Sequence, residues 1–250
     1  GDVIAKPVST ADWRMNQILF DEHFCPRCAS LINDIEPRYR DAPEKLAARD
    51  PVAVGALFEA LVYSGFAMTM MGTSRPASGG EHLFSHTRDM WTHVTGRPHD
   101  LHGRQVGLGT ILSAALYQQL CATDNHEWRA LPDDIDAEFW GRITPHLAPL
   151  YDAKREKAAA TPAALRGGGW ARVREALADS VDAPEKIADC LERAGAARRI
   201  ADIGADRADA VAVVRHMHEM RERVSVVDLA VMAGILPDRA DDLVDKWLCE

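Results

Sequence analysis

The chain has 250 residues, of which 47% are hydrophobic and 27% charged, so it can bury a sizeable core in one large domain or two small ones. Its net charge of −9, with no clustered basic stretch, excludes a general nucleic-acid surface, because phosphate binding needs a local excess of Lys and Arg. An odd count of five cysteines excludes a secreted disulfide framework. We recognise no signal peptide and no apolar run long enough to span a membrane, and therefore expect a cytoplasmic protein.

The first elements read as helices. The pattern from Ser9 begins with a helix cap and continues with apolar residues between Trp13 and Phe20 that can share one broad face. Further helix starts are expected at Asp41 and Asp50, because each has a proline in or near the first turn that would follow.

Cys25 and Cys28 form a C-x-x-C pair with two interpretations. A zinc ribbon would need a second such pair, and a thioredoxin-type pair would follow a strand, whereas this one follows a helical pattern. A buried or incidental thiol pair is the simpler interpretation, and a redox or structural metal role remains the alternative.

The longest apolar stretch runs from Val52 to Met71 and is interrupted by Glu59. Because it is apolar nearly all round, we expect a buried helix at the centre of a bundle.

The stretch from Ser74 to Thr110 is rich in candidate site residues. A break is expected over 74–80, a helix over 80–94, a loop over 95–102 and a second helix over 103–122. Six of the ten histidines lie within or close after this stretch: His82, His86, His93, His99, His102 and His126. The sequence therefore predicts a metal and substrate site here.

The second half is predicted to be helical as well. Asp133 opens a helix that continues through Ile143, and the Ala-rich segment 154–174 is interrupted at 161–162 and 167–169. Shorter helices are expected over 182–195, 206–221, 225–233 and 237–248. No stretch alternates convincingly with period two, so we predict an all-α multi-helix bundle, treated as one domain over residues 1–250.

Three side chains could bind a divalent metal: Asp2, His82 and His102. A catalytic site needs about three ligands of mixed O and N type and an open position. His82 and His86 are four residues apart and share a helix face. From spacing alone, surface or core histidines gathered by chance are an equal alternative. Leu83 follows His82 where a zincin has Glu, so a metalloprotease is not expected.

Three segments, 1–6 (Gly-Asp-Val-Ile-Ala-Lys), 74–86 (Ser-Arg-Pro-Ala-Ser-Gly-Gly-Glu-His-Leu-Phe-Ser-His) and 102–110 (His-Gly-Arg-Gln-Val-Gly-Leu-Gly-Thr), together resemble the C-terminal half of sn-glycerol-1-phosphate dehydrogenases. That family belongs to the superfamily of iron-containing alcohol dehydrogenases, glycerol dehydrogenase and dehydroquinate synthase. The tail from Arg223 to Ala230 is similar too.

The resemblance implies roles for individual residues. Asp2, His82 and His102 match the positions that hold a catalytic metal, with zinc expected first and nickel or iron as alternatives. Lys6 stands where the iron-dependent branch has a fourth ligand, which implies a three-ligand site and a cation suited to a substrate phosphate.

Three neighbouring residues, His86, Ser78 and Glu81, have less certain roles. His86 is expected to transfer a proton, with a helix-packing histidine as the alternative. Ser78, with the two glycines after it, either presents backbone N–H groups to an anionic substrate or forms a plain turn into the helix. Glu81 is expected to orient a metal ligand or cap its helix.

The resemblance also implies a missing part. Full-length relatives have an N-terminal α/β domain that binds NAD(P), and this chain shows no G-x-G-x-x-G after a strand. We therefore expect the helical half of an enzyme that reduces dihydroxyacetone phosphate to sn-glycerol 1-phosphate with NAD(P)H, inactive as an isolated chain. The alternatives are a glycerol or other polyol dehydrogenase and a non-catalytic helical module that binds a metal or a partner. A homo-oligomer is left open.

Overall fold

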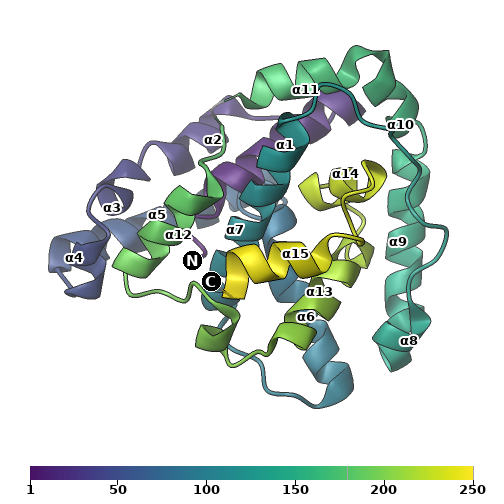
Figure 1. Ribbon diagram of the computed structural model, residues 1–250. Helices are drawn as coiled ribbons and strands as arrows, with labels where there is room; N and C mark the ends of the chain where they lie inside the picture. The colour runs from purple at the N-terminus through teal and green to yellow at the C-terminus, as the bar shows by residue number, and fades with distance from the viewer. Residues whose placement is uncertain (179, 250) are drawn as a thin grey trace.

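The computed structural model describes residues 1–178 and 180–249, and all the regular structure in these ranges is helical (Figure 1). No strand occurs in either range, which confirms the all-α prediction. The main helices of the first half are α1 (Lys6–Phe20), α2 (Pro26–Asn33), α3 (Pro37–Arg40), α4 (Glu44–Ala47), α5 (Pro51–Met71), α6 (Gly80–Thr95) and α7 (His102–Cys121). Those of the second half are α8 (Ala137–Trp140), α9 (Thr144–Ala158), α10 (Thr161–Ala164), α11 (Trp170–Leu177), α12 (Pro184–Arg193), α13 (Arg207–His216), α14 (Val226–Met232) and α15 (Ala240–Val244).

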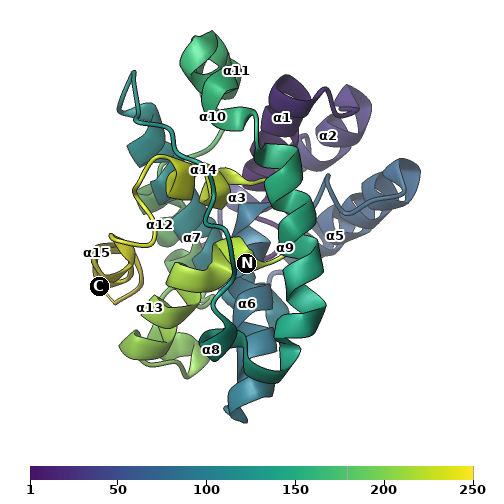
Figure 2. The same ribbon diagram turned by 90° about the vertical axis from the view of Figure 1, so that its right-hand side faces the viewer.

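The central helix of the fold is α7. Every residue from Gln105 to Tyr117 is buried, and α7 contacts α6, α12 and α14 around its circumference. The main hydrophobic cluster is built around this helix and includes Leu108, Leu112 and Leu116, each at most 1% exposed. In Figure 1, α6 and α7 lie between α9 on the right and helices α2–α5 on the left. Figure 2 looks at the molecule from that right-hand side, so α9 lies in front of it.

Helices α6 and α7 form the most extensive helix contact in the fold. They approach so closely that a Cβ added at Gly109 would lie 2.0 Å from the carbonyl oxygen of Glu81, a contact that no larger residue could make without a backbone shift. This crossing fixes the first turn of α6 against α7, and the candidate metal ligands His82 and His102 lie close to it.

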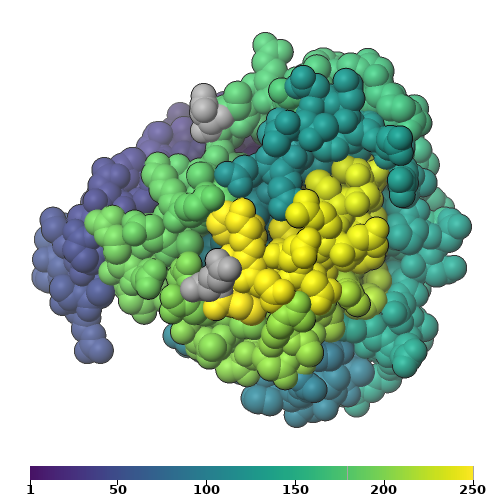
Figure 3. All heavy atoms as spheres, in the orientation of Figure 1, coloured from purple at the N-terminus to yellow at the C-terminus, as the bar shows by residue number. Residues whose placement is uncertain are grey.

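Helix α5 corrects two expectations. It is not the buried central helix: Val52, Phe58, Phe66 and Met70 are 55–77% exposed, and α5 lies in a peripheral lobe with α2, α3 and α4. The purple and blue lobe projects from the left of the molecule in Figure 3. An all-round apolar sequence cannot show which face will be covered, and here the covered face consists of small residues.

The small residues of α5 face its neighbours. Ala56, Ala60 and Ser64 are buried, and α5 packs on α2 and α3, while Glu59 pairs with Arg38 at 2.7 Å. Within the described ranges α5 is also the one helix long and apolar enough to cross a membrane, with 28% of its most apolar window buried. The expectation that no apolar run has that length was therefore wrong.

Other boundaries differ in detail. α1 begins at Lys6 rather than Ser9, because Pro7 is accommodated in its first turn. The helix expected from Asp133 through Ile143 contains only the short α8 and a 3-10 turn (Gly141–Ile143), and α9 follows directly with Pro149 inside it. The interruption at 167–169 is confirmed as a kink, where Gly168 has φ +90°.

Candidate metal centre

Three elements bring Asp2, His82 and His102 together. The turn over 1–5 lies against α7, where a Cβ on Gly1 would be 1.9 Å from the carbonyl oxygen of Gly103. His82 is in the first turn of α6, and His102 is the first residue of α7. The close crossing of α6 and α7 therefore sets the positions of the two histidines, and the contact between Gly1 and Gly103 sets the position of the Asp2 carboxylate.

The geometry of the three side chains suits one small cation. Their ligand atoms all lie within 4.8 Å of one another, with Asp2 Oδ1 3.2 Å from His82 Nε2 and 3.8 Å from His102 Nε2. Ligand atoms around a tetrahedral zinc ion are about 3.3 Å apart, given Zn–N and Zn–O bonds near 2.0–2.1 Å. One carboxylate and two imidazoles match the ligand types that zinc, nickel and iron accept.

Both histidines are held by the nitrogen that faces away from the centre. His82 Nδ1 is 2.8 Å from Glu81 Oε1, and His102 Nδ1 is 3.0 Å from Ser85 Oγ. Glu81 is fully buried, and its second carboxylate oxygen has no hydrogen-bond partner in the described structure. Such outer contacts fix the ring orientation and leave Nε2 for a metal, so Glu81 lies where an orienting residue is expected.

Lys6 lies beside Asp2. Its ammonium is buried and donates to Asp2 Oδ2 at 3.2 Å and to the carbonyl oxygen of Ala77 at 3.0 Å. Burial alone would raise the pKa of Asp2, but the hydrogen bond with His82 and the charge of Lys6 together bring that pKa well below its usual range. His82 and Lys6 therefore both favour the ionised carboxylate of Asp2, and the two hydrogen bonds of the Lys6 ammonium are made to groups of the protein itself.

The electrostatic environment differs between the two histidines. Burial lowers the pKa of His82, but hydrogen bonds with Asp2 and Glu81 outweigh burial and raise it overall. For His102, burial and the nearby His82 lower the pKa. A metal ligand must be a neutral imidazole, so binding would displace the proton that His82 shares with these two carboxylates.

His86 lies next to this cluster. Its ring centre is 5.8 Å from that of His82 and 5.5 Å from that of His102, and its Nε2 accepts a hydrogen bond of 2.8 Å from Arg221. Burial and the Arg221 charge lower the pKa of His86 to about 3, so the ring is neutral near pH 7. The ring proton is therefore assigned to Nδ1, which has no partner among residues 1–178 and 180–249.

The Ser78 segment forms a turn into α6. The backbone N–H of Gly79 donates to Glu81 Oε1 at 2.9 Å, and that of Gly80 donates to Asp12 Oδ2 at 2.6 Å. Two of the protein's own carboxylates thus occupy the positions where an external anion would bind, which favours the plain-turn interpretation. Ser78 is nearly buried, and its carbonyl oxygen accepts from Arg223.

Asp12 is a buried residue that our reading of the sequence did not single out. Its carboxylate accepts from the backbone N–H of Gly80 and Val226 and from the Tyr117 hydroxyl, joining α1 to α6, α14 and α7. Burial, with the Glu81 charge second, raises its pKa to about 7. An aspartate inside a helical pattern gives no sequence signal that it bridges four helices.

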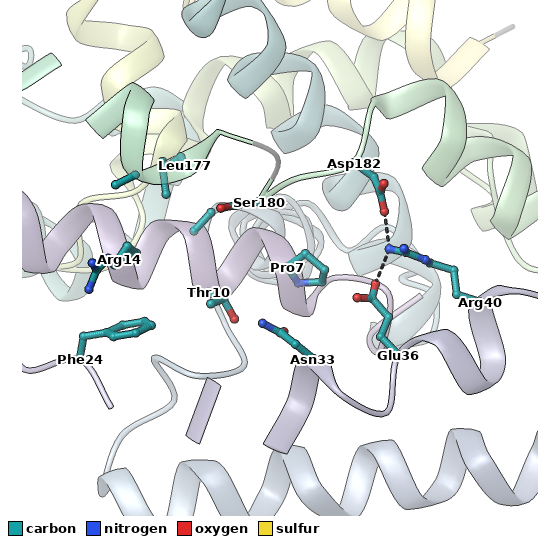
Figure 4. Close-up of a pocket in the computed structure, with 12 residues that line it drawn as sticks. Pro7, Thr10, Arg14, Phe24, Asn33, Glu36, Arg40, Leu177, Ser180 and Asp182 are labelled. Atoms are coloured by element: carbon teal, nitrogen blue, oxygen red, sulfur yellow. Dashed lines mark hydrogen bonds and ion pairs between the residues drawn. The ribbon is translucent and has the colours of Figure 1, made fainter. Parts of the chain in front are cut away.

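The remaining candidates lie elsewhere. Cys25 and Cys28 are free thiols at the start of α2, and Cys28 is buried against Trp13 and Ala29. Figure 4 shows a separate pocket of about 420 Å³ lined by α1, by the α2–α3 part of the lobe and by residues within 176–178 and 180–182, where Arg40 pairs with Glu36 and Asp182. Neither feature contributes to the metal cluster.

The fold and this cluster define a helical domain with a carboxylate and two histidines placed to hold a cation. No family model matches the chain. It is 28% identical over 221 residues to glycerol-1-phosphate dehydrogenase (NAD(P)+) of Geobacillus stearothermophilus, covering 88% of this chain and 49% of that protein. It is 37% identical over 118 residues to the enzyme of the same name from Halalkalibacterium halodurans, covering 47% and 30%. The corresponding protein of Pyrococcus furiosus is 40% identical over 118 residues, covering 47% and 33%.

The chain is homologous to glycerol-1-phosphate dehydrogenases over about half of their length. It spans about half the length of the curated relatives that it matches. The resemblance in its motifs is thereby confirmed as homology.

Proposed function

We propose that this chain is the metal- and substrate-binding half of an NAD(P)-dependent sn-glycerol-1-phosphate dehydrogenase. The convergence of Asp2, His82 and His102 carries the proposal, because it places a carboxylate and two imidazoles from separate elements within 4.8 Å. A divalent metal held there would act as a Lewis acid toward the carbonyl oxygen of dihydroxyacetone phosphate. The homology to enzymes named for this activity supports that substrate.

The surrounding residues would prepare the site. Lys6 donates a hydrogen bond to Asp2 and favours its ionised form, while Glu81 and Ser85 fix the rings of His82 and His102. His86 is the remaining candidate for substrate contact, because Nδ1–H of its neutral ring can donate a hydrogen bond to a substrate oxygen.

The dinucleotide is assigned to the part of the relatives that this chain does not span. Under this proposal the 250-residue chain alone has no turnover with dihydroxyacetone phosphate and NADH or NADPH. Steady oxidation of either cofactor by the purified chain, above a blank without substrate, would contradict this division of roles.

Metal content tests the centre directly. The chain is expected to bind about one equivalent of zinc, nickel or iron, and Asp2→Ala, His82→Ala and His102→Ala should each weaken binding by at least about tenfold. The measurement is metal analysis after dialysis, with affinity from competition with a chromogenic chelator.

His93→Ala is the matched control, because this substitution also removes an imidazole from α6, at a position that is exposed. It should bind metal as the unaltered chain does. Equal losses in His93→Ala and the three ligand variants would count against the assignment.

A further inference from the structure

Two arginines beside the metal cluster lack counter-ions. Arg221 and Arg223 lie between α13 and α14, both half-buried, and neither guanidinium has a carboxylate within 4.0 Å among the described residues. Exposed Arg207, by contrast, pairs with Asp241 and Asp245. Desolvation makes an unpaired cation more costly in the interior than at the surface. One would therefore expect the half-buried arginines to have carboxylate partners and the exposed arginine to have none.

Their hydrogen bonds leave part of each guanidinium unused. Arg221 donates to His86 Nε2, and Arg223 donates to the carbonyl oxygen of Ser78 at 2.6 Å and to Ser74 Oγ at 3.2 Å. A guanidinium has five N–H donors, and all three of these acceptors are neutral. Donor capacity and positive charge both remain available for an anion.

The nearby charges strengthen this point. Burial lowers the pKa of Arg223 to about 10, and the positive charges of Arg75 and Arg221 act in the same direction. Asp12 and Glu22 oppose them, but Asp12 is committed to backbone N–H groups and Tyr117, and Glu22 pairs with Arg75 and Lys157. The excess charge at the two arginines is therefore positive.

The backbone also holds Arg221 in place. Arg221 has φ +61°, a left-handed conformation that non-glycine residues seldom adopt. Its side chain crosses to α6 and reaches His86, whose ring centre is 5.5 Å from that of His102. An anion on these arginines would consequently lie beside the metal cluster, separated from it by one imidazole ring.

We propose that Arg221 and Arg223 form the subsite for the phosphate group of a phosphomonoester, next to His86. A phosphate dianion supplies the missing counter-charge and accepts the paired N–H donors of a guanidinium. The inference rests on the proposed function for the identity of the whole substrate, but the anion site is independent of any metal. It also assigns the phosphate to these arginines, because Lys6 is buried and committed to Asp2 and Ala77.

The test is calorimetric titration of the metal-free chain with inorganic phosphate, sn-glycerol 1-phosphate and glycerol. Both phosphates should bind, and glycerol should not. Arg221→Gln and Arg223→Gln should each weaken phosphate binding by about tenfold or more, as expected for a lost charged hydrogen bond. Arg207→Gln, with the same change of charge at an exposed site, should bind within twofold of the unaltered chain.

Two further variants keep the outcomes separable. Arg223→Gln could disturb the Ser74–Ser78 loop, so Arg221→Lys, which retains the charge, should show an intermediate loss. His102→Ala should lose metal and keep phosphate affinity, so failure of the metal centre and failure of the anion site are distinguishable. Absence of saturable phosphate binding, or the same affinity in Arg221→Gln and Arg207→Gln, would overturn the proposal.

Discussion

The α6–α7 pair and the α5 lobe are both rich in apolar residues but pack in opposite ways. Leu108, Leu112 and Leu116 of α7 are at most 1% exposed, whereas Phe58 and Phe66 of α5 are 68% and 55% exposed. Among the described residues, the hydrophobic clusters that include the lobe are small: one joins Ala67 to Trp13 of α1, and another contains Tyr39 and Ala60.

The difference shows that burial depends on neighbours more than on composition. Helix α7 is surrounded by α6, α12 and α14, while α5 is covered on one face by α2 and α3. Stability should therefore depend on α7 far more than on α5, and the candidate metal centre lies on the more stable pair.

The largest contrast is expected from side-chain truncation. Leu116→Ala should lower the free energy of unfolding by about 2–5 kcal/mol, because it leaves a cavity in the packed core. Phe58→Ala removes a larger side chain from a 68% exposed position and should cost less than about 0.5 kcal/mol. Urea denaturation measures the unfolding free energy of both variants, and equal losses would contradict the difference in packing between α7 and α5.

A pair of glycines provides the second test. In Gly109→Ala the new Cβ would lie 2.0 Å from the carbonyl oxygen of Glu81, so we expect a loss of about 3 kcal/mol from overpacking. A Cβ at Gly65 in α5 would meet nothing within 4 Å. Gly65→Ala should therefore stabilise by about 0.5–1 kcal/mol through helix propensity. Thermal melts of the two variants would disagree with this account if their melting temperatures shifted in the same direction.

The third test is a pH dependence at the junction between α1 and the lobe. Burial raises the pKa of Glu36 to about 7, so the folded chain binds this proton more tightly than the unfolded chain. The contribution to stability is full below about pH 4.5 and is lost as pH rises through about 7, by on the order of 3 kcal/mol.

In Glu36→Gln this dependence should disappear. The difference in unfolding free energy between the unaltered chain and the variant should thus change between pH 4.5 and 7.5 in urea titrations. The exposed Glu222→Gln serves as control. A difference that stays constant over this range would show that Glu36 titrates normally in the folded protein.

Much of the fold was predictable where local signals agree. The Gly-rich break before α6, the loop before His102 and the start of α7 lie within a residue or so of the predicted positions. Helix α5 was identified but misplaced, because an all-round apolar helix carries no information about its covered face. The Asp133 helix failed because its capping signal does not reveal how short α8 is.

The site was predictable in part, from sequence motifs rather than from local helix signals. The motifs containing Asp2, His82 and His102 indicated candidate ligands, and the structure brings these side chains together, although metal binding stays a prediction. Ser85, Asp12 and Arg221 reach the site through tertiary contacts alone, since their partners are 17, 68 and 135 positions away. No local pattern encodes such contacts.

The two-part construction of the cluster has a kinetic consequence. His82 and His102 belong to helices joined by the Gly109 contact, whereas Asp2 belongs to the turn over 1–5. A bound ion would thus be released when that turn detaches, without separation of α6 from α7. The rate of ion transfer to a chelator would report on the docking of this one turn, while the two imidazoles remain assembled and ready to capture the next ion.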